Sequence, residues 1–110
     1  MGYTLIAKGF SVSPQISTSE VKAIADAGFK SIICNRPDAE QGAIPHGQIE
    51  AQAKAAGLEF RYIPVISGGL TRENAVDMAA ALRDLPQPVL AYCRSGARSS
   101  NLYMVAQQVG

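Results

Sequence analysis

The sequence predicts an α/β fold: a single domain in which a mainly parallel, four-stranded sheet is flanked by helices. Short apolar runs alternate along the 110 residues with amphipathic segments, and this alternation is typical of parallel sheets covered on both faces. No repeat, low-complexity tract or linker interrupts the pattern. A chain of this length buries about two-thirds of its unfolded surface, so we expect one domain over residues 1–110.

An edge ribbon and a capped helix come first along the chain. Residues 4–13 are expected to form a hairpin or ribbon at the edge of the sheet. Thr18 or Ser19 can cap the next helix, because a hydroxyl there accepts from a free N–H group of the first turn. Gly28 then ends this helix.

Three apolar runs have the length and composition of strands that are buried on both faces. They occupy residues 29–35, 58–65 and 89–92. The segments between them predict one helix at residues 46–56 and another that Thr71 caps and Pro86 ends. The apolar face of a last helix consists of Leu102, Val105, Ala106 and Val109.

Composition excludes several classes of protein. Apolar residues make up 47% of the chain and the net charge is +1, which argues against a disordered acidic chain and against a nucleic-acid partner. Two cysteines, Cys34 and Cys93, are too few for the disulfide framework of a small secreted protein. The sequence shows no signal-peptide pattern and no apolar run that could span a bilayer, so we expect a cytoplasmic protein with no membrane contact.

The most informative segment is residues 93–100, Cys-Arg-Ser-Gly-Ala-Arg-Ser-Ser, which follows the last apolar run. Its N–H groups and the start of the next helix favour a thiolate, so Cys93 is the candidate nucleophile. Gly96 relieves the tight turn, and Arg98 can bind an oxyanion with two parallel hydrogen bonds. The candidate oxyanion-binding residues of the loop are Arg94, Ser95, Gly96 and Ala97. The alternative is an ordinary strand–turn–helix connection around a buried cysteine.

Loops that leave the carboxyl ends of parallel strands meet at one edge of the sheet, where such folds bind ligands. Here they are residues 35–42, 66–70 and 93–98. In the resulting cleft, Asp38 can serve as a general acid or simply form a turn. Arg36 can add positive potential or pair with Asp38 or Glu40. Arg94 is expected to face solvent, where it can select anionic substrates.

Two further polar residues complete the set. Ser99 can hydrogen-bond the thiolate or cap the last helix. His46 stands alone, without the Cys, His or carboxylate spacing of a metal site, so we expect a surface or capping role and no metal. Thiol chemistry at Cys93 also requires no organic cofactor.

Several segments together carry a resemblance to a known family. They are residues 10–16, 28–30, 35–38, 63–65, 68–69 and 92–99. Over nearly its whole length the chain resembles the small bacterial phosphatase-like domain that also occurs beside a metallo-hydrolase module in beta-lactamase hydrolase-like proteins. The resemblance implies a dual-specificity-phosphatase-like fold, and a metallo-hydrolase or persulfide dioxygenase as a partner.

The resemblance also implies roles for two side chains. A hydroxyl at the position of Ser99 stabilises the thiolate in cysteine phosphatases. A cysteine at the position of Cys34 forms a disulfide with the nucleophile in some phosphatases of this fold, which makes Cys34 a candidate redox partner of Cys93. The alternative is that Cys34 is a small, buried apolar residue.

The Cys-x4-Arg loop itself is closer to rhodanese sulfurtransferases, whose loops often read Cys-Arg-Ser-Gly-x-Arg-Ser. Cysteine phosphatases have His-Cys-x5-Arg and a nearby aspartate that protonates the leaving group. Here Tyr92 replaces the histidine, the loop is one residue shorter, and residues 66–70 contain no acid. Sulfite and thiolates leave without a proton, so we predict a sulfurtransferase that forms a Cys93 persulfide from thiosulfate or glutathione persulfide.

Two alternatives stay open. The first is a cysteine phosphatase of protein-tyrosine or dual-specificity type, in which Cys93 attacks a phosphoester and forms a phosphoenzyme. The second is a non-catalytic module that holds an oxyanion in the same loop without turnover.

Overall fold

Five strands form one mixed sheet in the computed structural model, which describes residues 2–109. The strands are β1 (Thr4–Ala7), β2 (Phe10–Ser13), β3 (Ser31–Cys34), β4 (Glu59–Tyr62) and β5 (Val89–Tyr92). They lie in the order β1-β2-β5-β3-β4, and β1 alone runs antiparallel to its neighbour. The α/β class and the mainly parallel sheet are confirmed. The predicted total of four strands is wrong, because the sheet has five.

The additional strand comes from the N-terminal ribbon. The ribbon was expected only to edge the sheet, but its second half, β2, lies inside it and pairs in parallel with β5, with Phe10 opposite Val89 and Ser13 opposite Tyr92. All four residues of β2 are buried. Local sequence patterns do not encode a pairing between segments so far apart, and β1 is left as the true edge strand.

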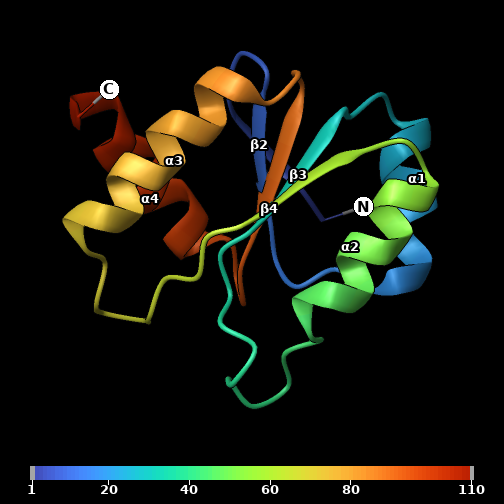
Figure 1. Cartoon of the computed structure of the whole chain (residues 1–110), viewed down its shortest axis with the longest axis horizontal. Helices are drawn as coiled ribbons and strands as arrows, with labels where there is room; N and C mark the ends of the chain where they lie inside the picture. The colour runs from blue at the N-terminus through green and yellow to red at the C-terminus, as the bar shows by residue number, and fades with distance from the viewer. Residues whose placement is uncertain (1, 110) are drawn as a thin grey trace.

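Helices cover both faces of the sheet. They are the 3₁₀ turn η1 (Thr18–Glu20) and the α-helices α1 (Val21–Asp26), α2 (His46–Ala55), α3 (Arg72–Asp84) and α4 (Ala97–Val109). Figure 1 shows α3 and α4 on one side of the strands and α1 and α2 on the other. Each of these helices is shorter than the roughly 20 residues that cross a bilayer, and none in residues 2–109 has the length and apolar character of a membrane span.

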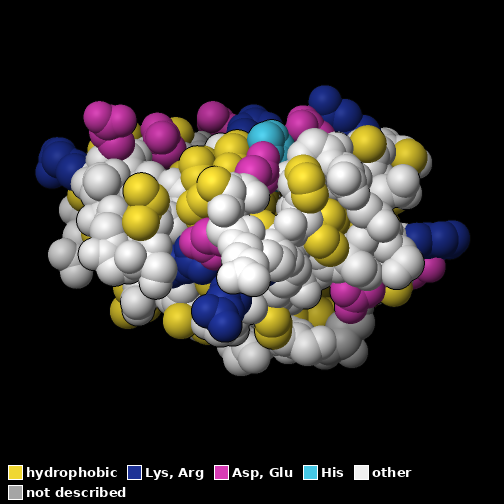
Figure 2. Space-filling view, turned by 90° about the horizontal axis from the view of Figure 1, so that it is seen from below, with side chains coloured by type: hydrophobic (Ala, Val, Ile, Leu, Met, Phe, Trp, Pro, Cys, Tyr) yellow, Lys and Arg dark blue, Asp and Glu magenta, His cyan; other side chains and the backbone are white. Residues whose placement is uncertain are grey.

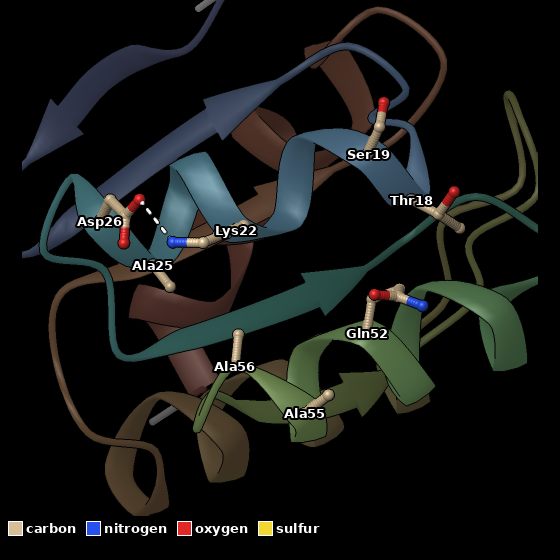
Figure 3. Close-up of a pocket in the computed structure, with 8 residues that line it drawn as sticks. All are labelled: Thr18, Ser19, Lys22, Ala25, Asp26, Gln52, Ala55 and Ala56. Carbon is tan, nitrogen blue, oxygen red and sulfur yellow. Dashed lines mark hydrogen bonds and ion pairs between the residues drawn. The ribbon is translucent and has the colours of Figure 1, made fainter.

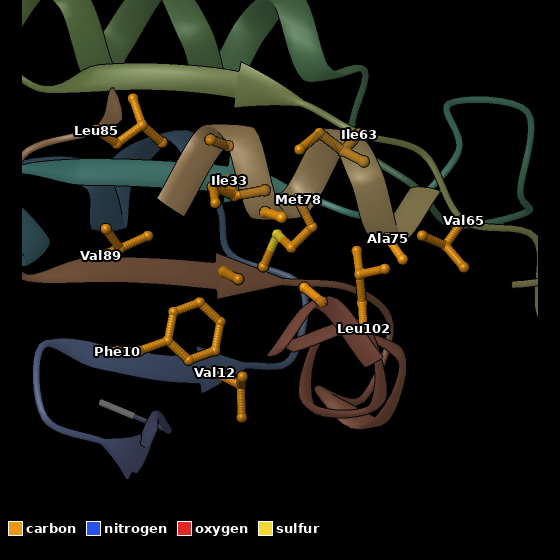
Figure 4. Packing of buried hydrophobic residues seen from close by; sticks show 14 residues of the cluster. Phe10, Val12, Ile33, Ile63, Val65, Ala75, Met78, Leu85, Val89 and Leu102 are labelled. Carbon is orange, nitrogen blue, oxygen red and sulfur yellow. The ribbon is translucent and has the colours of Figure 1, made fainter. Parts of the chain in front are cut away.

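Each face of the sheet has its own apolar core. On one face, Ile33 and Val89 of the sheet pack with Met78 of α3 and Leu102 of α4 (Figure 4). On the other, Ile32 and the rest of a second cluster pack under α1 and α2. Because successive residues of a strand point to opposite faces, both clusters draw on the same buried strands. This packing fixes the carboxyl ends of β2, β5, β3 and β4 at one edge of the sheet.

Helix caps match the sequence at one position and differ at another. Thr71 caps α3 as predicted, since its Oγ1 accepts a hydrogen bond of 3.1 Å from the Asn74 N–H. The first helical segment is capped at Ser17 instead of Thr18 or Ser19. Glu20 decides this, because its carboxylate reaches back to accept from the Ser17 N–H at 2.7 Å, as in a capping box.

Candidate active site

The loop after β5 wraps around the sulfur of Cys93. The Gly96 N–H donates to Cys93 Sγ at 3.0 Å, and Cys93 itself is 0% exposed. Gly96 has φ +96°, and a Cβ at this position would lie 3.5 Å from the backbone of Ser13. The Cys93 N–H in turn donates to the Ser13 carbonyl at 3.3 Å. Ser13, at the end of β2, therefore packs against the backbone of the Cys93 loop.

The surroundings of Cys93 favour its ionised form. Burial by itself would raise the pKa of the thiol, but the N–H groups of Ser99, Ser95 and Gly96 outweigh it, and the net pKa is lowered. The buried Ser99 hydroxyl makes no hydrogen bond in this structure, yet it lies close enough to the sulfur to lower its pKa as well. Ser99 is in the first turn of α4, whose N-terminal dipole acts in the same direction.

Arg98 lies on the same turn and is held by a carboxylate from another loop. Its two terminal nitrogens donate to Glu40, Nη1 at 2.5 Å and Nη2 at 2.9 Å, and Nη1 also donates to the Val65 carbonyl at 2.8 Å. Glu40 accepts a third bond, of 3.0 Å, from Nε of Arg36. Arg36 thus pairs with Glu40, one of the two partners proposed for it.

Three of the candidate residues, Arg36, Arg94 and Arg98, border a hollow of about 310 Å³ at the carboxyl ends of the strands. Its lining is charged, with Arg36, Glu40, Arg94 and Arg98 beside the polar Gln41 and Ser67. Figure 2 shows the molecule from this side, where basic and acidic side chains adjoin near the middle of the face. Arg94, Ser95 and Ala97 are exposed, so the loop presents its outer surface to solvent.

Asp38 lies in the same loop as Glu40 but makes different contacts. Its carboxylate accepts from the His46 N–H at 2.8 Å and pairs with His46 Nδ1 at 2.7 Å. The His46 ring stacks on Tyr62 with 3.7 Å between ring centroids, and the Asp38 N–H donates to the Tyr62 hydroxyl at 3.1 Å. Asp38 therefore holds the start of α2, and its role as a general acid stays a prediction.

Cys34 lies one register position from Cys93. It is opposite Tyr92, the residue before Cys93, and its thiol donates to the Arg36 carbonyl at 3.4 Å. Burial raises the pKa of Cys34, so its thiol is a weak nucleophile at neutral pH. Both cysteines are free, and the redox partnership of Cys34 with Cys93 stays a prediction.

A second, larger hollow lies apart from this site. A larger groove, of about 450 Å³, runs between α1 and α2 and is bordered by the exposed ion pair of Lys22 with Asp26 (Figure 3). It contains no nucleophile and none of the candidate residues. Among residues 2–109, no group of three or more His, Cys, Asp or Glu side chains is arranged to hold a metal ion.

Sequence reasoning considered Glu40 only as a partner for Arg36, and did not connect it with Arg98. The available signal was its place in the loop of residues 35–42, which was expected to reach the cleft. The contact with Arg98 spans 58 residues, so it depends on the conformation of that loop and has no local sequence signature.

The fold and the Cys93 loop together define a phosphatase-like α/β domain of the cysteine-nucleophile type. The chain belongs to the family described as "Beta-lactamase hydrolase-like protein, phosphatase-like domain", whose model matches residues 2–110. It is 33% identical over 99 residues to a beta-lactamase hydrolase-like protein of Xylella fastidiosa, covering 89% of this chain and 23% of the relative. The chain thus spans about a quarter of the length of this curated relative.

Solved structures agree with this assignment. A phosphatase candidate from Neisseria meningitidis has a TM-score of 0.80 and 33% identity, over 88% of this chain and 70% of its own. The core catalytic domain of a PP-IP phosphatase from S. cerevisiae has a TM-score of 0.66 and 15% identity, over 86% and 56% of the two chains. The second likeness shows the fold alone, and confirms the predicted similarity to cysteine phosphatases.

Proposed function

We propose that this domain is a cysteine-dependent phosphatase that hydrolyses phosphate monoesters through Cys93. The observation that carries the proposal is the hydrogen bond of 3.0 Å from the Gly96 N–H to the Cys93 sulfur, in a loop that leads directly to Arg98 in the first turn of α4. This is the arrangement that a thiolate nucleophile and a phosphoryl oxyanion both require. The family and the neisserial relative, itself a phosphatase candidate, support phosphoryl over sulfur transfer.

The reaction takes place in two displacements. The Cys93 thiolate attacks phosphorus, the bond from phosphorus to the ester oxygen breaks, and the leaving oxygen takes the electron pair and then a proton. Water next attacks the phosphocysteine, which releases inorganic phosphate and returns the thiolate. During both steps Arg98 and the N–H groups of residues 94–99 stabilise the charge on the equatorial oxygens.

The source of the leaving-group proton sets the expected substrates. Among the residues that line the hollow, Glu40 alone is acidic, and its hydrogen bonds with Arg98 and Arg36 lower its pKa. An ionised Glu40 cannot donate a proton, and Asp38 is engaged by His46. Loss of a general acid costs about a hundredfold to ten-thousandfold in rate, so we expect strong preference for good leaving groups such as aryl oxides.

The missing acid is also the observation that favours a second candidate, sulfur transfer. In that reaction the Cys93 thiolate attacks the sulfane sulfur of thiosulfate, the sulfur–sulfur bond breaks, and sulfite leaves with the electron pair. No proton donor is needed. The spacing of four residues between Cys93 and Arg98 is also that of the rhodanese sulfurtransferase loop. The cytoplasmic location and a partner metallo-hydrolase or persulfide dioxygenase remain part of the proposal under either reaction.

Parallel assays on one purified protein separate the candidates. Phosphate release from an aryl phosphate is compared with sulfite release from thiosulfate and with turnover of glutathione persulfide. Cys93→Ser is the inactive variant, and Cys34→Ser makes the same atomic change at a buried cysteine outside the loop. Phosphate release that depends on Cys93 alone supports the phosphatase. Persulfide formation on Cys93 without phosphate release overturns it in favour of sulfur transfer. Retained alkylation of Cys93 with turnover of none of the three substrates favours a binding module.

A further inference from the structure

The guanidinium of Arg98 is held at its two terminal nitrogens. A guanidinium has five N–H donors. Glu40 and the Val65 carbonyl take three of them, two from Nη1 and one from Nη2. The Nε–H and the second Nη2 proton, which together form the side edge of the group, donate to no oxygen among residues 2–109, and the nearby Cys93 sulfur is the one group that interacts with Arg98 besides Glu40 and Val65 there. The two donors of this side edge have the spacing to form parallel hydrogen bonds with two oxygens of a tetrahedral anion.

The Glu40 carboxylate is itself held by Arg36. Arg36 donates from Nε to Glu40 at 3.0 Å, from Nη1 to the Gln15 side chain at 3.1 Å and from Nη2 to the Gln41 carbonyl at 2.8 Å. Arg36 is only 6% exposed, so all three of its nitrogens are committed inside the protein. A chain of contacts therefore runs from the loop after β2, through Arg36 and Glu40, to Arg98.

The Cys93 sulfur is a close neighbour of the Arg98 guanidinium. The hydrogen bonds from Glu40 are the main reason that the pKa of Arg98 is raised, and the neighbouring Cys93 sulfur raises that pKa further. Glu40 and the Val65 carbonyl occupy only protons of the two terminal nitrogens, so the Nε–Nη2 edge is the part of the guanidinium that an anion can still bind. An anion above Cys93 can bind Arg98 without displacing Glu40.

We propose that Glu40 is the positioning residue for Arg98: it holds the terminal nitrogens so that the Nε–Nη2 edge faces the oxyanion bound above Cys93. The inference deepens the proposed function, on which it rests for the presence of an anion at that place. It applies equally to a phosphoryl group and to the sulfonate end of thiosulfate, because both present tetrahedral oxygens. The opposite possibility is that Glu40 competes with the anion for Arg98.

Binding of inorganic phosphate tests the inference without turnover. Phosphate is titrated into the protein, and the amide signals of residues 94–99 are followed by NMR. Glu40→Gln keeps the size of the side chain and removes its charge, and it is expected to weaken phosphate binding about tenfold, the usual effect of losing one charge-assisted hydrogen bond. Glu59→Gln, an exposed position on β4, is the matched control and should leave the affinity unchanged.

Two further variants separate positioning from charge. Glu40→Asp keeps the negative charge but withdraws the carboxylate by one methylene, so positioning predicts weaker binding here too, while competition predicts little change. Arg98→Lys keeps the positive charge but removes the paired N–H donors of the guanidinium. In the Arg98→Lys background, Glu40→Gln should add little further loss, because Glu40 acts only through Arg98.

Unchanged or tighter phosphate binding by Glu40→Gln overturns the inference, as does a full additional loss in the Arg98→Lys background. Wild-type protein that binds neither phosphate nor sulfate at residues 94–99 overturns it too. If these titrations behave as expected but no Cys93-dependent phosphate release is found, the phosphatase proposal fails and the role of Glu40 stands.

Discussion

Gly96 donates its N–H to Cys93 Sγ, three residues earlier in the chain, at 3.0 Å. The bond depends on the left-handed backbone of Gly96, whose φ is +96°. Only glycine adopts such a conformation without strain. The curvature that directs the loop amides at the sulfur therefore depends on a residue that has no side chain.

Replacement of Gly96 by alanine is expected to damage both stability and thiolate chemistry. The left-handed conformation costs an L-residue about 1–2 kcal/mol, and relaxation of the loop away from Ser13 turns the N–H groups from the sulfur. Chemical denaturation should show the loss in the free energy of unfolding, and the pKa of Cys93 should rise.

Gly47→Ala is the matched control, because Gly47 lies in α2 without a positive φ and with open space where a Cβ would be. Gly47 lies in the first turn of α2, so alanine there is expected to stabilise by at most about 1 kcal/mol relative to glycine. Equal effects of the two substitutions would show that the backbone of the Cys93 loop has no special requirement for glycine.

The two cysteines are expected to respond differently to mild peroxide. The pKa of Cys93 is lowered by loop N–H groups against the effect of burial, whereas burial raises the pKa of Cys34. We expect a sulfenic acid on Cys93, trapped by dimedone and located by mass spectrometry, with Cys34 unmodified. A Cys34–Cys93 disulfide in the folded protein would instead establish Cys34 as the redox partner.

Asp38→Asn tests whether Asp38 holds a helix or supplies a proton. The Asp38 carboxylate accepts from the first N–H of α2 and pairs with His46, so its loss should cost about 1 kcal/mol of stability at neutral pH. His46 lowers the pKa of Asp38 despite the opposing effect of desolvation. This stabilisation is therefore complete above the ordinary aspartate pKa of about 3.9, and is lost as the pH falls through the lower pKa of the folded state.

Unfolding free energies of wild type and Asp38→Asn should accordingly converge in acid. The acid limb of the pH–rate profile for phosphate release should be the same in both proteins. A flattened acid limb in Asp38→Asn would mean that Asp38 is the general acid after all.

Local signals predicted much of the fold. The cap at Thr71 and the start of α2 at His46 follow from side-chain chemistry within a few residues. Ser17 was also within reach of sequence reasoning, since Ser-Thr-Ser-Glu at residues 17–20 has the spacing of a capping box. The place of β2 beside β5 was not, because parallel pairing joins segments that are distant in sequence and similar in pattern.

The candidate site divides in the same way. Cys93, Gly96 and Arg98 lie within one six-residue motif, and its chemistry could be read directly. The link from Arg98 to Glu40 depends on how the loop after β3 folds over the strand ends, which residue types alone do not specify. The pairing of Asp38 with His46 has the same origin, since Asp38 lies within that loop and His46 directly follows it.

The most direct measurement is the ionisation of Cys93 as a function of pH, taken from the ultraviolet absorbance of the thiolate in wild type minus Cys93→Ser. Loop N–H groups overcome the effect of burial and lower the pKa of Cys93, so the absorbance step should lie clearly below the value of about 8.5 for a free cysteine. A step at or above that value would contradict a thiolate held by this loop, and with it both proposed reactions.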